Sequence, residues 1–155
     1  MTIRRQTGLL EERLTRAVIR SLFDVHGELG FGYREFIYAL ALERDLVAKG
    51  HRVDREVAVM VYFRGEPLAR QTLDMIVDER LVVEIKTGLH LHPSASLQLF
   101  SYLCTTNFEV GLLLHFGEEP KFSRVIYENR LKRRTTIHKR EDGTDPTINR
   151  QREHQ

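Results

Sequence analysis

The sequence predicts a single α/β domain, and three observations carry that prediction. Two stretches near the N-terminus have apolar residues at helical spacing. Alternating apolar residues follow, which is the period of a half-buried strand. A nearly continuous apolar run then comes, which is typical of a strand covered on both faces. The helices are expected over 9–29, 33–49 and 95–106, and the strands over 53–63, 69–77, 81–86, 110–116 and 122–127.

Glycine, proline and polar residues mark the boundaries between these elements. Gly30-Phe31-Gly32 separates the first two helices, and Gly50 ends the second. Gly65-Glu66-Pro67 predicts a turn, and Asp78-Glu79-Arg80 predicts a hairpin loop between two strands. Ser94 is placed to cap the third helix. These signals give the order helix, helix, three strands, helix, strand, strand.

Composition sets the broad class. The chain has 155 residues, of which 41% are hydrophobic and 30% charged, which suits one globular domain. Its one cysteine, Cys104, excludes an internal disulfide and a metal-binding cysteine pair. The N-terminus has no apolar segment of the secretory type, and apolar runs are far shorter than the roughly 20 residues that span a bilayer. We therefore expect a cytoplasmic protein with no membrane partner.

Periodicity disappears near the C-terminus. We expect a folded domain over residues 9–130 and a basic, flexible tail over 131–155, because polar residues cannot offset the entropy of ordering them. The tail carries seven Lys and Arg against four Asp and Glu, and the whole chain has a net charge of +2, so the body stands at −1. Lys132, Arg133 and Arg134 are the candidates in the tail for binding phosphates.

Asp74, Glu84 and Lys86 have the spacing of a metal-dependent phosphodiesterase site built on two neighbouring strands. Glu84 and Lys86 share one face of their strand. A two-residue loop would place Asp74 on the opposite side, whereas the three-residue loop 78–80 sets Asp74 directly across from Glu84. The hypothesis therefore requires the odd loop.

Two carboxylates about 5 Å apart across a strand pair repel each other unless a cation lies between them. Oxygen ligands favour Mg²⁺ or Mn²⁺. Such a metal would activate a water, with Lys86 stabilising the charge that develops on phosphate. Glu35 on the preceding helix is the best third carboxylate. Gln98 and Tyr102 lie four apart on one helical face, where amide and phenol can contact phosphate.

The stretch Gly32-Tyr33-Arg34-Glu35-Phe36-Ile37-Tyr38 reads G-x-x-E-x-x-Y and resembles the family of small proteins named for that motif. That family belongs to the PD-(D/E)XK nuclease superfamily. The resemblance runs from about residue 14 to 129 and includes 83–87, 98–103 and 111–117. It implies a restriction-endonuclease-like core, in which a mixed sheet has helices on both faces. It is preceded here by an extra N-terminal helix.

The resemblance also implies site residues and partners. Asp74, Glu84 and Lys86 become the catalytic trio, Gln98 and Tyr102 match the motif of RecB-type nucleases, and Glu35 is the helix-borne acid. DNA is a better fit than RNA, and a homodimer is a further expectation. The chain departs from the family at Gly30-Phe31-Gly32, where Gly-Pro-Gly is usual, and at residues 95–97, where His-Glu-Ala is common.

Two other readings stay open. A nuclease-like fold can serve as a module that binds nucleic acid or protein without turnover. The polar cluster can also be a satisfied ion-pair network with no affinity for metal or nucleic acid. An aspartate inside the apolar stretch 73–77 argues against the second of these, because an unpaired buried carboxylate is costly.

Overall fold

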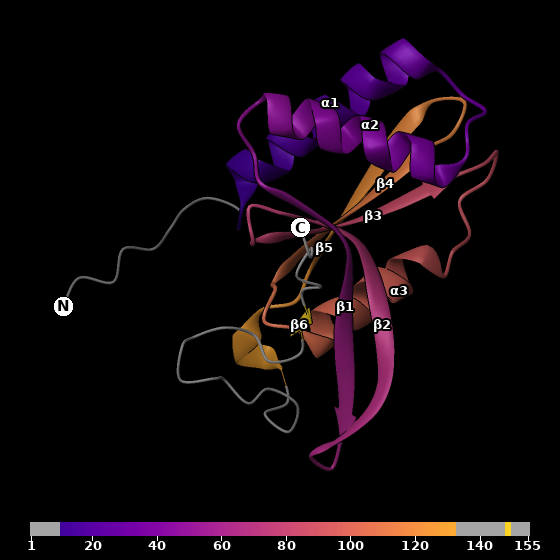
Figure 1. Cartoon of the computed structure of the whole chain (residues 1–155). Coiled ribbons are helices and arrows are strands. Elements are labelled where there is room, and N and C mark those ends of the chain that lie inside the picture. The colour runs from indigo at the N-terminus through magenta and orange to yellow at the C-terminus, as the bar shows by residue number, and fades with distance from the viewer. Residues whose placement is uncertain (1–9, 133–147, 150–155) are drawn as a thin grey trace, which may run out of the picture.

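The structure is a computed structural model that describes residues 10–132 and 148–149 (Figure 1). Each strand and helix expected from the sequence is present within them. The elements are α1 (Glu12–Leu29), α2 (Glu35–Ala48), β1 (Val53–Phe63), β2 (Glu66–Val77), β3 (Leu81–Thr87), α3 (Ala95–Thr105), β4 (Val110–Phe116), β5 (Pro120–Ile126), a 3₁₀ turn (Asn129–Leu131) and β6 (Ile148–Asn149).

The strands form one mixed sheet in the order β5-β4-β3-β2-β1-β6. β3 and β4 run parallel and are joined through α3, while the other neighbouring pairs are antiparallel. A tight turn reverses the chain and so joins antiparallel strands. Two neighbouring parallel strands need a longer crossover connection, here a helix. The predicted fold class, a mixed sheet flanked by helices, is confirmed.

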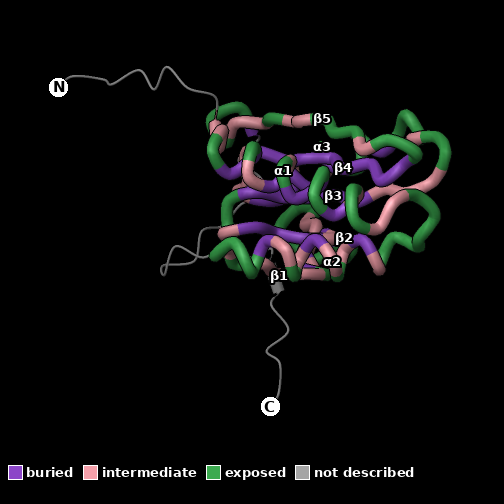
Figure 2. Tube along the Cα trace, turned by 90° about the horizontal axis from the view of Figure 1, so that it is seen from above, coloured by how far each residue is buried: buried purple, intermediate pink, exposed green. Residues whose placement is uncertain are grey.

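Helices cover both faces of the sheet, and each face has its own apolar cluster. The first cluster packs α1 and α2 on β3 and β4, through residues such as Leu22, Leu42 and Ile85. The second packs α3 on the opposite face, through Leu99 and Leu103. β3 and β4 are therefore buried on both sides, as the apolar run at 110–116 predicted (Figure 2). These two central strands are the rigid support for any side chain they carry.

The hairpin of β1 and β2 changes faces halfway along its length. Met75 packs in the cluster under α1 and α2, whereas Leu73 packs in the cluster under α3. Residues two apart normally share a face, so the alternation reverses at Asp74. Glu56 stands opposite in the register, between the pairs of Arg55 with Met75 and Val57 with Leu73, and has a φ of 52°. Asp74 thus lies at the point where the ribbon twists.

Some boundaries differ from the sequence prediction. β2 begins at Glu66, so the turn is confined to Arg64 and Gly65, with φ of 49° and 80°. Positive φ at both residues is what a two-residue hairpin turn needs. Ser94 is at the start of α3 but makes no side-chain cap bond, because its hydroxyl is bonded to His92 Nδ1 at 2.6 Å.

The end of the described body also differs from the expectation. Lys132 does not lie in a solvated tail, since only 7% of its surface is exposed. Its ammonium donates to the carbonyl oxygens of Thr106 at 2.9 Å and Phe108 at 2.5 Å. The rest of the expected tail lies outside the described residues, apart from β6. None of the helices in the described ranges is long and apolar enough to cross a membrane.

Candidate active site

The loop between β2 and β3 has the odd length that the site requires. Val77 pairs with Leu81 and Met75 with Val83, so the loop is Asp78-Glu79-Arg80. Asp78 and Glu79 have φ of 51° and 56°, and the Arg80 N–H donates to the Val77 carbonyl at 3.1 Å. Continuing this register by one residue sets Asp74 opposite Glu84, as the sequence analysis required.

Asp74 is held against β3 by a bond to the backbone. The N–H of Ile85, between Glu84 and Lys86, donates to Asp74 Oδ2 at 2.8 Å. Burial raises the pKa of Asp74, and the Ile85 bond and the Lys86 charge act in the opposite direction. The carboxylate is therefore fixed with one oxygen on the backbone of the neighbouring strand.

Glu84 is the most deeply buried of the site residues. It is 2% exposed, and its Oε1 lies 3.2 Å from Lys86 Nζ. Its Oε2 is buried without a hydrogen-bond partner within the described residues. Burial, followed by the charge of Asp74, raises the pKa of Glu84 to about 7, although Lys86 opposes the shift. A buried carboxylate with an empty acceptor calls for a proton or a cation.

Glu35 approaches the same site from the first turn of α2. Glu35 is exposed to solvent, yet partial desolvation raises its pKa, with the charge of Lys86 lowering it and that of Asp74 raising it. It therefore lies within electrostatic range of both residues. Even so, no group of three or more His, Cys, Asp and Glu converges on one metal position in the described part of the chain. Glu35 stands beside the pair rather than in a preformed triad.

Gln98 and Tyr102 meet on one side of α3. Gln98 Nε2 donates to the Tyr102 hydroxyl oxygen at 2.9 Å. Tyr102 is 3% exposed, and burial, followed by the charge of Glu84, raises its pKa to about 12. The shared helical face predicted for this pair thus brings the phenol into range of Glu84. Gln98 is exposed and reaches solvent.

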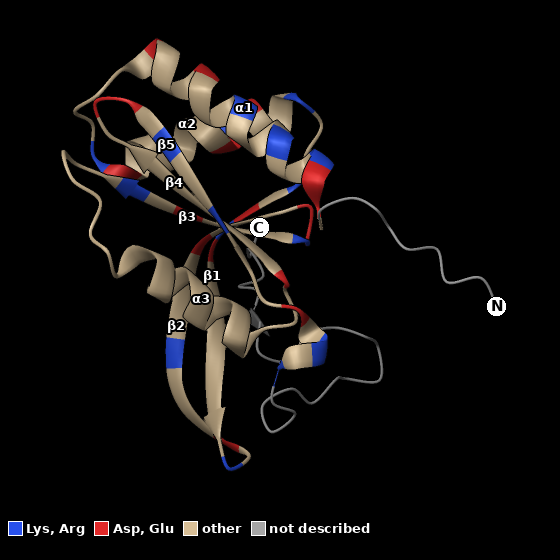
Figure 3. Ribbon diagram, turned by 180° about the vertical axis from the view of Figure 1, so that it is seen from behind, with Lys and Arg blue, Asp and Glu red and all other residues tan. Residues whose placement is uncertain are grey.

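Of the predicted phosphate contacts in the tail, only Lys132 lies within the described residues. Lys132 has its ammonium on two backbone carbonyls, and Arg133 and Arg134 lie outside the described residues. On the described elements, Lys and Arg are interspersed with Asp and Glu rather than gathered in one stripe (Figure 3). Lys86 is the cation whose charge acts on Glu35, Asp74 and Glu84.

Two side chains near the end of β3, His115 and Tyr38, were assigned no role in the site by the sequence analysis. His115 neighbours Lys86 in the parallel ladder, and its Nε2 lies 2.9 Å from the Gly88 carbonyl. Tyr38 stacks on Phe116 at the end of β4, and its hydroxyl donates to the Gly30 carbonyl at 2.5 Å. His115 could have been identified only from the pairing of β3 with β4, and the sequence does not show which strands pair.

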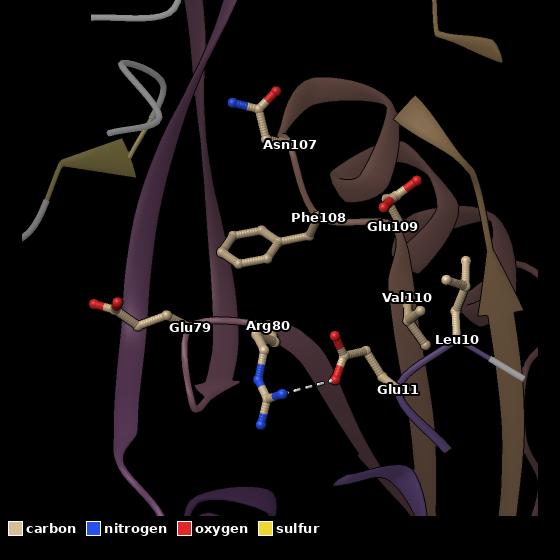
Figure 4. Close-up of a pocket in the computed structure, with 8 residues that line it drawn as sticks. All are labelled: Leu10, Glu11, Glu79, Arg80, Asn107, Phe108, Glu109 and Val110. Atoms are coloured by element: carbon tan, nitrogen blue, oxygen red, sulfur yellow. Dashed lines mark ion pairs between the residues drawn. The ribbon is translucent and has the colours of Figure 1, made fainter. Parts of the chain in front are cut away.

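A hollow near the opposite end of β3 is separate from this site (Figure 4). It lies by the β2–β3 loop and the start of β4, and no predicted site residue lines it. Arg80 and Glu11 face each other across it at 3.4 Å. Its lining is Leu10, Glu11, Glu79, Arg80, Asn107, Phe108, Glu109 and Val110.

The Asp74 and Glu84 pair fits a divalent metal on the chemistry of its donors. Both ligand groups are carboxylates, which suit Mg²⁺ or Mn²⁺. The partnerless Glu84 Oε2 is an acceptor that a cation would satisfy. A mixed α/β sheet with two acids and a lysine on adjacent strands is the arrangement of a metal-dependent nuclease-type fold.

Comparison with known proteins gives the same class. The family model of the PD-(D/E)XK nuclease superfamily matches residues 12–125, and the chain belongs to this superfamily. The resemblance stated from the sequence is confirmed at that level. Membership of the narrower G-x-x-E-x-x-Y family stays a prediction.

Two further comparisons add little. No curated protein matches the chain. Among solved structures, the chain is similar to one titled "Crystal structure of SSO0001", with 20% identity and a TM-score of 0.46. The match covers 76% of this chain and 59% of that one, so the chain spans about three fifths of its length. That likeness is too distant to carry an argument.

Proposed function

We propose that this protein is a metal-dependent nuclease that hydrolyses phosphodiester bonds of nucleic acid, DNA in preference to RNA. The observation that carries the proposal is the buried Glu84, whose Oε2 lacks a partner within the described residues beside Asp74 and Lys86. An ion-pair network that served stability alone would gain by filling this acceptor, because an unsatisfied buried oxygen costs about 1–3 kcal/mol.

Asp74 and Glu84 would hold the cation, and Glu35 would be the acid available to a second one. A bound Mg²⁺ or Mn²⁺ lowers the pKa of a coordinated water and offsets negative charge on phosphate. The chain's own part is to orient both carboxylates, while a bound cation would favour their ionised forms against the burial that raises the pKa of each. Asp74 is oriented by the Ile85 amide, and Glu84 by its contact with Lys86.

Lys86 would stabilise the charge that develops on the phosphate oxygens. Its ammonium lies on the same face of β3 as the Glu84 carboxylate, which is where a metal-bound phosphate would approach. Tyr102 has a raised pKa and therefore stays protonated at neutral pH, so its hydroxyl remains a hydrogen-bond donor. Gln98, exposed next to it, offers an amide to the substrate backbone.

The test is calorimetric titration of Mn²⁺ and Mg²⁺ into wild type and Asp74→Asn at pH 8, with cleavage of plasmid and oligonucleotide DNA measured on the same samples. Asp24→Asn is the matched control, because Asp24 is half exposed on α1 and pairs with Lys49. We expect metal binding and cleavage in wild type and control, and neither in Asp74→Asn. Wild type that binds no metal at any pH would overturn the proposal.

A binding module without turnover is the second candidate. The observation in its favour is that no three metal-binding side chains converge within the described residues. This module would bind nucleic acid equally well before and after Asp74→Asn, and no cleavage would appear with either metal.

A further inference from the structure

Three large aromatic side chains are exposed in the segment that joins α1 to α2 and in the first turn of α2. Phe31 is 42% exposed, Tyr33 47% and Phe36 57%. Isolated exposed apolar side chains are normal, but three exposed aromatics within six residues of sequence are an unusual concentration of apolar surface. Phe31 lies in the stretch Gly30-Phe31-Gly32, where the chain departs from the sequence pattern usual in the family it resembles. Packing in the core therefore does not account for these exposed side chains.

The segment is held rigidly by Tyr38. The Tyr38 hydroxyl donates to the Gly30 carbonyl at 2.5 Å, and the Tyr33 N–H donates to the Tyr38 oxygen at 3.3 Å. The rings of Tyr33 and Tyr38 meet edge to face with centroids 6.0 Å apart. Tyr38 is fully buried and stacks on Phe116 at 4.3 Å. The exposed rings thus sit on an anchored support and lose little freedom when something binds.

The same anchor places the segment next to the proposed active site. Phe116, on which Tyr38 stacks, pairs in the sheet with Thr87, the residue after Lys86. Glu35, between Tyr33 and Phe36 in the chain, is within electrostatic range of Lys86 and Asp74. The α1–α2 connection and the end of β3 lie at the same end of the molecule (Figure 1).

Charge and shape indicate what such a surface binds. Arg34, between Tyr33 and Glu35 in the chain, is also exposed, and guanidinium groups bind phosphate. Aromatic rings with a nearby cation are the usual surface for unpaired bases, whose faces are free to stack. In a duplex those faces are already covered by neighbouring bases, so an exposed ring gains little from them.

We propose that Phe31, Tyr33 and Phe36 form a stacking platform for unpaired bases, and that the substrate is single-stranded or frayed nucleic acid led past Lys86. The assignment of a substrate rests on the proposed nuclease function, whereas the binding surface does not. One strand would lay its bases on the platform and its phosphates toward Arg34 and the carboxylate site.

The test measures binding separately from cleavage. Fluorescence anisotropy is recorded with a fluorescein-labelled 20-nucleotide single strand and with the matching blunt duplex, using Asp74→Asn as the parent so that no cleavage occurs. Phe36→Ala and Phe36→Trp are compared with Phe122→Ala. Phe122 is the matched control, because it is 47% exposed on β5.

We expect Phe36→Ala to weaken single-strand binding about 5- to 150-fold, the range that loss of one stacked base gives. Phe36→Trp should restore affinity, and Phe122→Ala should change nothing. Duplex binding should be weaker than single-strand binding in the parent. Unchanged thermal unfolding of the variants shows that the fold is retained, as expected for residues so exposed.

Several results would overturn the proposal. These are equal affinity of Phe36→Ala and Phe122→Ala for the single strand, preference of the parent for duplex, or no binding to either probe, which would assign the patch to a protein partner. The two proposals fail separately. Binding that depends on Phe36 in a protein that never cleaves supports the platform and rejects the nuclease. Cleavage of duplex that is unaffected by Phe36→Ala supports the nuclease and rejects the platform.

Discussion

The backbone N–H of Ile85 donates a 2.8 Å hydrogen bond to Asp74 Oδ2, so the acid of one strand is fixed by the strand that carries the other acid. The ladder pairs between β2 and β3 run from Val77 with Leu81 to Met75 with Val83. Beyond that point the Asp74 side chain takes up the next available amide. This relationship explains how one apolar strand presents a carboxylate beside Glu84 while the rest of the hairpin turns to the other face.

The first prediction concerns Glu84 in metal-free protein. Because burial raises its pKa from the usual 4.5 to about 7, the folded state binds a proton more tightly than the unfolded chain. That advantage is fully present below about pH 4.5 and is lost as pH rises through about 7. Glu84→Gln should therefore stabilise the protein by up to about 3 kcal/mol at pH 8, with little effect near pH 4.5.

Urea unfolding with a chelator present, at pH 4.5 and pH 8, measures this difference. Glu28→Gln is the control, because Glu28 is exposed near the end of α1. It should shift the free energy of unfolding by no more than about 0.5 kcal/mol at either pH. Equal effects of Glu84→Gln at the two pH values would show that the carboxyl is not held in a perturbed state.

The second prediction separates metal binding from turnover at Lys86. Lys86→Met removes the cation that lies 3.2 Å from Glu84 Oε1. Cleavage should fall by about 10²–10³-fold, the usual loss when one charge-stabilising group is removed. Calorimetry at pH 8.5 should still detect Mn²⁺ binding, because both carboxylates remain to hold the ion, although loss of Lys86 raises the pKa of Glu84 further. Loss of Mn²⁺ binding together with cleavage would instead make Lys86 a support of the metal site.

The architecture could be predicted because the spacing of apolar residues close in sequence indicates its main helices and strands. The strand limits at 53–63 and 110–116 match the structure residue for residue. The odd loop at 78–80 followed from requiring Asp74 and Glu84 to share a face. What the sequence did not reveal depends on contacts between distant segments. The reversal of faces at Asp74, the bonds of Tyr38 to Gly30 and Tyr33, and the burial of Lys132 are of this kind.

The site itself was predictable only in part. Spacing on a strand placed Glu84 beside Lys86, and spacing on a helix placed Gln98 beside Tyr102, because both are local geometry. Glu35 was predicted as the best third carboxylate, a role that the resemblance also implied, and its pKa responds to the charges of Lys86 and Asp74. Composition could not show that Glu84 Oε2 lies buried without a partner in the described body. That feature arises when β3 is covered on both faces.

The third prediction tests how tightly α3 sits on the sheet. A Cβ added at Gly111 on β4 would lie 2.7 Å from Leu99 Cδ1 and 2.9 Å from its Cγ, so the whole side chain must move. Gly111→Ala should destabilise the protein by about 1–3 kcal/mol, as overpacked cores do. It should also reduce any cleavage, since Leu99 lies on the helix that carries Gln98 and Tyr102.

Gly27→Ala is the matched control, because it makes the same chemical change in a place with room. Gly27 lies inside α1, and a Cβ there meets nothing within 4 Å. Alanine should stabilise the helix by about 0.5–1 kcal/mol through its higher propensity. Opposite signs in a thermal or urea unfolding series support the packing argument. If Gly111→Ala is neutral, α3 must shift without cost and the site cannot depend on its position.

The last prediction concerns Lys132, which the sequence placed in a phosphate-binding tail and the structure buries. Its ammonium bonds to the carbonyls of Thr106 and Phe108, which follow α3, so it ties the C-terminal end of the body to that turn. Lys132→Met should lower the free energy of unfolding by about 2–4 kcal/mol, since two bonds from a charged donor are lost. Lys121 is exposed on β5, so Lys121→Met should change the free energy of unfolding by no more than about 0.5 kcal/mol.

The salt dependence of oligonucleotide binding gives the complementary readout for Lys132, because each phosphate contact adds nearly one unit to the slope of log binding constant against log salt concentration. If Lys132→Met loses stability and leaves the slope unchanged, Lys132 supports the fold. If it reduces the slope and leaves stability unchanged, Lys132 contacts phosphate in the nucleic acid.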